Sequence, residues 1–153
     1  MAKVSMTKLG LTKNNEVIEK EFNEQVIEIK KYLPVEEKLD LISRIINNSV
    51  DTNNFYNPCR VHIFTIIELI KTYTNISFTE KQQENVFKFY DLLAGTGLAG
   101  AVIPAIPEEE YMFIHEGVEE TIKSIYSFKN SAMGILEAVS QDYSNLNLDA
   151  TEI

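Results

Sequence analysis

The chain has 153 residues, 44% of them hydrophobic and with only 6 Gly and 4 Pro, which suits one packed globular domain and argues against a low-complexity chain. Its 23 Asp and Glu outnumber 14 Lys and Arg, and the formal net charge of -9 repels nucleic-acid phosphates and anionic lipid. A lone cysteine, no apolar run at the N-terminus and no apolar segment of about 18 residues indicate an intracellular protein that is neither secreted nor membrane-spanning.

The first 33 residues predict a β-hairpin. Val17–Phe22 and residues 26–33 place β-branched or aromatic residues and charged residues at near-alternate positions, and residues 23–25 supply a turn. One face of this hairpin should therefore be exposed to solvent. Residues 4–9, ended by Gly10, could add a third strand. A sheet of this size is marginal alone and must pack on helices or on a partner's edge.

Residues 34–48 predict an amphipathic helix. Pro34 suits a first helical position, and Glu36 and Glu37 suit the positive end of the helix dipole. The polar, turn-rich residues 47–58 should then break the chain. The apolar stripe of this helix is formed by Leu39, Leu41, Ile42, Ile45 and Ile46.

The next segments also have helical spacing. Residues 60–73 predict a helix, although their β-branched content leaves a strand open for part of the segment. Thr79 and Gln82 form a capping-box pattern that should open a helix over residues 80–94, with Gly95 as its C-cap. The apolar face of that helix is expected at Val86, Phe87, Tyr90 and Leu93.

Prolines divide the C-terminal part. Residues 98–103 can form only a short helix, because Pro104 and Pro107 interrupt it. The acids that follow Pro107 open the longest predicted helix, whose apolar stripe continues to about Tyr143 and should form the spine of the core. A kink or break is expected near residues 130–134. Residues 144–153 are predicted to form a flexible acidic tail.

We therefore predict an α+β fold, in which an N-terminal hairpin or three-stranded sheet packs on four to five helices. Residues 1–33 form the hairpin region, and residues 34–143 form the helical region of the same domain.

One glycine motif resembles a nucleotide-binding turn. Gly95, Gly97 and Gly100 match the letters GxGxxG, and Glu119 lies about as far downstream as the motif requires. The expected context is wrong, however, because a helical run precedes the glycines and Pro104 soon follows them. A helix cap and a tight turn between helices are favoured, and no cofactor is expected.

The histidines and the cysteine do not form a recognisable catalytic or metal site. His115 has Glu119 one helical turn later, which favours a solvated pair over metal binding. Cys59 and His62 could form a nucleophile and a base, but no third group or oxyanion loop can be identified. Glu108, Glu109 and Glu110 diverge around a helix and are better explained by the helix dipole. We therefore expect no enzymatic activity and no metal.

Aromatic and Met residues occur on more than one face of several predicted helices, which exceeds what one apolar stripe can bury. For each residue, burial in the core is the alternative. The candidate partner-binding residues are Phe55, Tyr56, Phe89, Tyr111, Met112 and Phe113.

Five segments resemble small proteins from the morphogenesis genes of tailed phages and prophages of low-GC Gram-positive bacteria, including tail assembly chaperones. Their sequences are KKYLPVEEKL at residues 30–39, YTNISFTEKQ at 73–82, YDLL at 90–93, AIPEEEY at 105–111 and DYSNLNLD at 142–149.

This resemblance implies a non-enzymatic role in virion assembly, with a phage tail or tape-measure protein as partner. It implies a location in the host bacterial cytoplasm, or in the virion if the protein is structural. Such relatives often continue past the Asp-rich segment. A tail or neck component that forms homo-oligomers and an inhibitor of a host defence protein are the alternatives.

Overall fold

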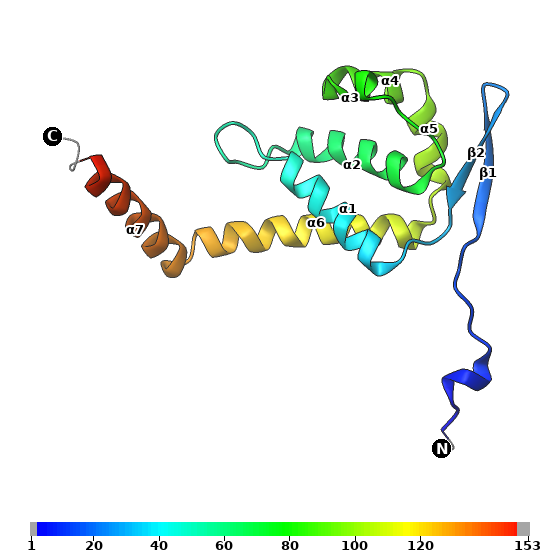
Figure 1. Cartoon of the computed structure of the whole chain (residues 1–153), viewed down its shortest axis with the longest axis horizontal. Helices are drawn as coiled ribbons and strands as arrows, with labels where there is room; N and C mark the ends of the chain where they lie inside the picture. Colours follow the sequence, from blue (N-terminus) through cyan, green and yellow to red (C-terminus); the bar gives the residue numbers. More distant parts are fainter. Residues whose placement is uncertain (1–2, 150–153) are drawn as a thin grey trace. The chain divides into compact units, whose positions relative to one another are not determined.

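The computed structural model describes the backbone of residues 3–149 and the side chains of residues 3–143. The chain divides into two compact units, residues 1–114 and 115–153. This division falls inside the longest helix and coincides with neither predicted boundary. In chain order (Figure 1), the elements are η1 (Met6–Leu9), β1 (Val17–Phe22), β2 (Gln25–Lys30), α1 (Val35–Asn48), α2 (Pro58–Tyr73), α3 (Glu80–Gln83), α4 (Val86–Gly95), α5 (Leu98–Val102), η2 (Ile103–Ala105), α6 (Glu108–Lys129) and α7 (Ala132–Asp149).

The predicted hairpin is confirmed as a two-stranded antiparallel sheet of β1 and β2. Asn23 and Glu24 form its loop, and both have positive φ angles, 48° and 62°, as a type I′ turn requires. On β2, Ile27 and Ile29 are buried while their neighbours are exposed, so one face is wet as predicted. The α+β class is therefore confirmed.

The third strand predicted over residues 4–9 is wrong. Residues Met6–Leu9 form the 3-10 helix η1, and none of them is buried. Gly10 ends this turn with a φ of 60°, a conformation that glycine adopts without strain. The alternation in this segment was weak, and no sheet edge pairs with it.

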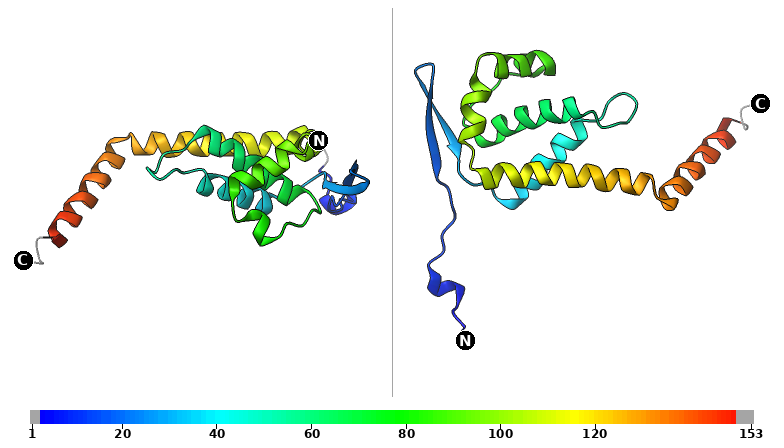
Figure 2. Two further views of the ribbon diagram at one scale, coloured as in Figure 1. Left: turned by 90° about the horizontal axis from the view of Figure 1, so that it is seen from above. Right: turned by 180° about the vertical axis from the view of Figure 1, so that it is seen from behind.

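Two helices, α1 and α2, pack against each other and carry most of the core of residues 1–114. The hairpin lies beside the C-terminal end of α2 (Figure 2), where Ile29 pairs with Thr74. The helix predicted over residues 60–73 is confirmed, with no strand in the segment. Asn57 caps α2, because its side chain accepts hydrogen bonds from the N–H groups of Cys59 and Arg60. In α1, the predicted stripe is buried except for Leu39, which is exposed.

The single helix predicted over residues 80–94 is interrupted. Thr79 and Gln82 form both hydrogen bonds of the capping box, but α3 ends at Gln83 and α4 begins only after Asn85. Asn85 forms a second cap, since its side chain accepts from the N–H of Lys88. This new phase buries Phe89 with Leu93 and leaves Phe87 exposed.

The glycine-rich turn follows α4 and not a strand. Gly95 belongs to α4, and Gly97, with a φ of 83°, is the residue in the left-handed region. Thr96 is the C-cap of α4, so the cap predicted at Gly95 is displaced by one residue. Within the described residues, no single helix is long and apolar enough to cross a membrane, and only α4 together with residues 98–105 reaches that composition, across a bend of 60°.

The unit of residues 115–153 contains the rest of α6 and all of α7, and the predicted break near residues 130–134 is confirmed. Ser131 precedes α7 and caps its first turn, since its side-chain oxygen accepts from the N–H of Gly134 at 3.2 Å. A Cβ atom on Gly134 would clash with the carbonyl oxygen of Phe128 and would lie 2.9 Å from that of Lys129. The bend therefore requires glycine.

The segment predicted as a flexible tail is partly helical. It begins at residue 144, whereas α7 continues to Asp149. Residues 150–153 of the predicted tail lie outside the described residues.

Candidate protein-binding surface

A buried ion pair joins α1 to the start of α6. Lys38 Nζ lies 2.6 Å from Glu110 Oε1, and the two side chains are only 8% and 7% exposed. Glu110 Oε2 accepts a hydrogen bond from the N–H of Leu33 at 3.0 Å and another from the hydroxyl of Tyr73 at 3.0 Å. We call Lys38, Glu110 and Tyr73 the buried cluster.

The electrostatics of the buried cluster favour a structural role. Burial and the negative charge of Glu110 raise the pKa of the Tyr73 hydroxyl, so this group stays a donor. The ammonium of Lys38 also lies 4.4 Å from the ring centroid of Tyr32 and 5.0 Å from that of Phe113. Both carboxylate oxygens of Glu110 are thus occupied, and the cluster ties together segments from four parts of the chain.

The sequence did not reveal this role of Glu110, which was explained by the helix dipole alone. Glu108 and Glu109 are exposed in the same first turn, as that explanation requires. One signal was present: Lys38 lies one turn before Leu41 and Ile42, on the apolar face of its helix. A charge at such a position must find an opposite charge in the core.

The predicted partner-binding residues have different environments. Phe89 is 2% exposed and packs edge-on against Phe78, with ring centroids 5.0 Å apart, so its assignment to a surface is wrong. The others remain candidates by their exposure: Phe55, Met112 and Phe113 are exposed, and Tyr56 and Tyr111 are half-buried.

The structure does not gather these candidates into one surface. Phe55 and Tyr56 lie in the loop between α1 and α2, whereas residues 111–113 lie in the first turns of α6. This loop and the start of α6 lie at opposite ends of α2 (Figure 1). Phe113 partly covers Lys38, which gives that ring a structural contact as well.

A larger apolar surface lies on α7. We define the α7 face by its exposed large apolar side chains, among which Leu136 and Tyr143 are each 66% exposed. The apolar spacing of this stripe predicts the spine of the core. In the structure the stripe is buried only at its beginning, at Ile114 and Val118. The α7 face consists of Met133, Ile135, Leu136, Val139 and Tyr143.

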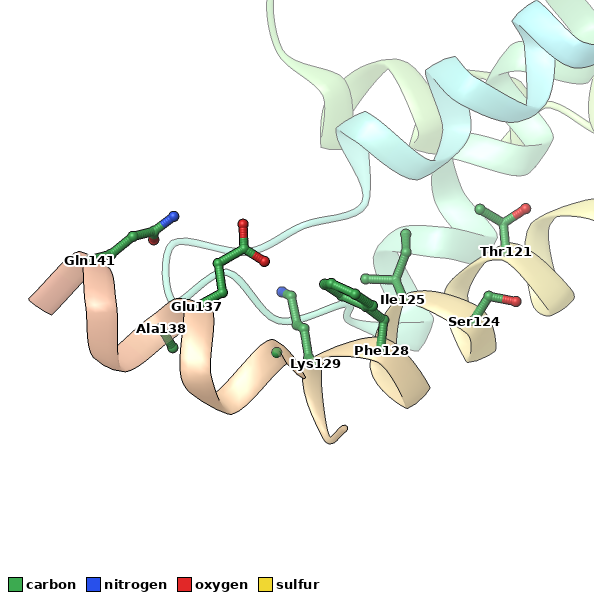
Figure 3. Close-up of a pocket in the computed structure, with 9 residues that line it drawn as sticks. Thr121, Ser124, Ile125, Phe128, Lys129, Glu137, Ala138 and Gln141 are labelled. Atoms are coloured by element: carbon green, nitrogen blue, oxygen red, sulfur yellow. The ribbon is translucent and has the colours of Figure 1, made fainter. Parts of the chain in front are cut away.

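A groove of about 640 Å³ lies at the bend between α6 and α7. Ile125 and Phe128 line it from α6, and Gly134 and Ala138 line it from α7. Figure 3 shows Phe128, Lys129 and Glu137 pointing to the same side of this bend. At 3.6 residues per turn, the α7 residues that line the groove point on average away from Leu136, Val139 and Tyr143. The groove and the α7 face are therefore different surfaces that adjoin at their edges.

A smaller cavity of about 410 Å³ contains the cysteine and one histidine. It is lined by Pro58, Cys59, His62, Ile63 and Tyr90. His62 Nε2 lies 3.3 Å from the hydroxyl oxygen of Tyr90. This contact makes a tyrosine hydroxyl a polar partner of the histidine.

The second histidine pairs with an acid on its own helix, as predicted. His115 Nε2 and Glu119 Oε1 are 3.6 Å apart on an exposed side of α6. Among the described residues, no group of three or more His, Cys, Asp or Glu side chains could hold a metal ion.

No protein family, curated protein or solved structure shows significant similarity to this chain.

Proposed function

We propose that the protein is a non-enzymatic binding protein of phage virion assembly, similar in action to a tail assembly chaperone. The observation that carries this proposal is the α7 face. Large apolar patches on the surface of monomers often mark binding sites, since their burial by a partner contributes roughly 25 cal/mol per Å². The resemblance described above supports the choice of phage assembly.

The proposed partner is a phage tail or tape-measure protein, bound in the host bacterial cytoplasm. A net charge of -9 suits a protein partner and disfavours direct binding of nucleic acid or membrane. The same charge keeps copies of the chain apart in solution, which helps a protein that exposes apolar side chains. No catalytic step and no cofactor enter this proposal.

Co-expression with the tape-measure protein and the tail-tube subunit of the same phage tests this function. We expect the tape-measure protein to become more soluble and to co-purify with the chain. Substitution of Leu136 and Val139 by Ser should abolish both effects. The matched control is Leu39→Ser, which changes an exposed leucine of α1.

Two other outcomes of these experiments would favour the alternative functions. Large homo-oligomers in light scattering, without a bound tail protein, would favour a structural virion component. Co-purification of a host defence enzyme in place of a tail protein would favour an inhibitor.

A further inference from the structure

The α7 face has the spacing of a helix-pairing seam. Leu136, Val139 and Tyr143 follow one another at intervals of three and four residues, and Ala132 lies four residues before them. A seam with this spacing stays on one side of a helix and packs against a second helix by inserting its side chains between those of the partner. Met133 and Ile135 flank the seam and widen its apolar contact area.

The charged side chains at the edges of the α7 face have one sign. Asp142 lies next to the seam, Glu137 lies one turn after Met133 at the edge nearer the groove, and both are exposed. The helix contains no Lys, Arg or His. In a paired helix, Asp142 occupies a position next to the seam, where charged side chains of the two helices meet. The chemistry that complements this helix is therefore an apolar stripe with basic residues on its borders.

We propose that the α7 face binds an amphipathic helix of another protein, whose apolar stripe is bordered by Lys or Arg. This inference rests on the proposed binding function and specifies the chemistry of its partner. The net charge of -9 would also attract such a basic segment over long range.

A second copy of the chain fits this surface less well. Two copies of α7 would match apolar seam to apolar seam, but neither copy brings a cation to face Asp142 or Glu137. Each copy also adds its own negative net charge, which opposes association. The charge pattern thus favours a different, basic partner.

Two synthetic helical peptides provide the probe. Both are about three heptads long with Leu at the seam positions, and one has Lys and the other Glu at the bordering positions. Titrated into the full chain, the Lys peptide should bind at least about tenfold more tightly than the Glu peptide, and added salt should weaken its binding. Equal affinities for the two peptides, or no binding, would overturn the proposal.

Replacing the two acids of α7 by lysine distinguishes this specific pairing from nonspecific hydrophobic binding. Glu137→Lys with Asp142→Lys should reverse the preference, so that the Glu peptide binds better. The control Glu19→Lys with Glu21→Lys changes the net charge equally on exposed positions of β1 and should leave the preference for the Lys peptide unchanged. An equal effect of both pairs would show that only net charge matters, and would contradict a site on α7.

Further measurements show whether a variant still folds, and separate a failure of the peptide-binding site from a failure of the proposed function. Circular dichroism should show unchanged helix content in each variant, because all exchanged residues are exposed. A dimer that is lost on Leu136→Ser with Val139→Ser would make a second copy the occupant and overturn the proposal. If the peptides behave as expected but no tail protein co-purifies, the assembly function fails while the basic-helix site stands.

Discussion

At the scale of single residues, Glu110 joins the start of α6 to α1, to α2 and to the segment between β2 and α1. Its two oxygens accept from Lys38, Tyr73 and the backbone of Leu33. A buried ion pair is costly to break, because the remaining charge stays in a low-dielectric interior without a partner. We therefore expect this pair to hold residues 108–114 of α6 against α1.

Replacement of Glu110 by Gln should lower the free energy of unfolding by about 3 to 5 kcal/mol. The ammonium of Lys38 would then remain buried without a carboxylate. Urea unfolding followed by circular dichroism measures this loss. Adding Lys38→Met should recover part of it, because the unpaired charge is removed.

The matched control is Glu109→Gln, an exposed acid in the same turn. We expect a change within about 0.5 kcal/mol for this surface position. Equal effects of the two substitutions would contradict the role given to the buried cluster.

Alkaline pH should test the Tyr73 hydroxyl. Below the ordinary tyrosine pKa of 10.0, both folded and unfolded chains keep this proton. Above it the unfolded chain loses the proton while the folded chain, with its raised pKa, keeps it, so the free energy of unfolding falls as pH rises. Unfolding in urea at increasing pH should show this decline, and Tyr73→Phe should reduce it. An identical decline in both chains would contradict the raised pKa.

At the scale of elements, the sequence predicted most of the fold because the relevant signals are local. The alternation in β1 and β2 and the capping box at Thr79 both act within a few residues. The interruption between α3 and α4 was missed because Asn85 acts as a second cap inside an apolar pattern. The weak alternation in η1 shows that strand signals without a pairing partner do not suffice.

The break between α6 and α7 depends on Gly134. In Gly134→Ala, the added Cβ would collide with the Phe128 carbonyl, and the two helices should straighten. Spin labels at residues 120 and 141, with Cys59→Ser, would measure this change. We expect the label separation to lengthen towards the roughly 31 Å of a continuous helix.

Gly100→Ala is the control for this substitution. A Cβ atom on Gly100 meets no atom within 4 Å, and its φ angle is not positive. The label separation should not change in that variant. An unchanged separation in Gly134→Ala would show that the bend does not depend on glycine.

At the scale of the whole molecule, the chain combines strong acidity with exposed apolar side chains. The spacing of Leu136, Val139 and Tyr143 predicts an apolar helix face, but spacing alone does not determine what covers it. The same spacing also suits a core helix, and only the accessibility of the side chains separates α7 from α1 and α2. The buried cluster was equally hidden, because Lys38 and Glu110 are far apart in the sequence.

The central claim is that the protein binds its partner through the α7 face. Hydrogen–deuterium exchange, measured on the free chain and on the complex from co-expression with tail proteins, tests it most directly. The exposed helix α7 should exchange quickly when free and become protected over residues 132–143 in the complex, while α1 changes little. Protection confined to residues 3–114, or no protection in any complex recovered, would contradict the claim.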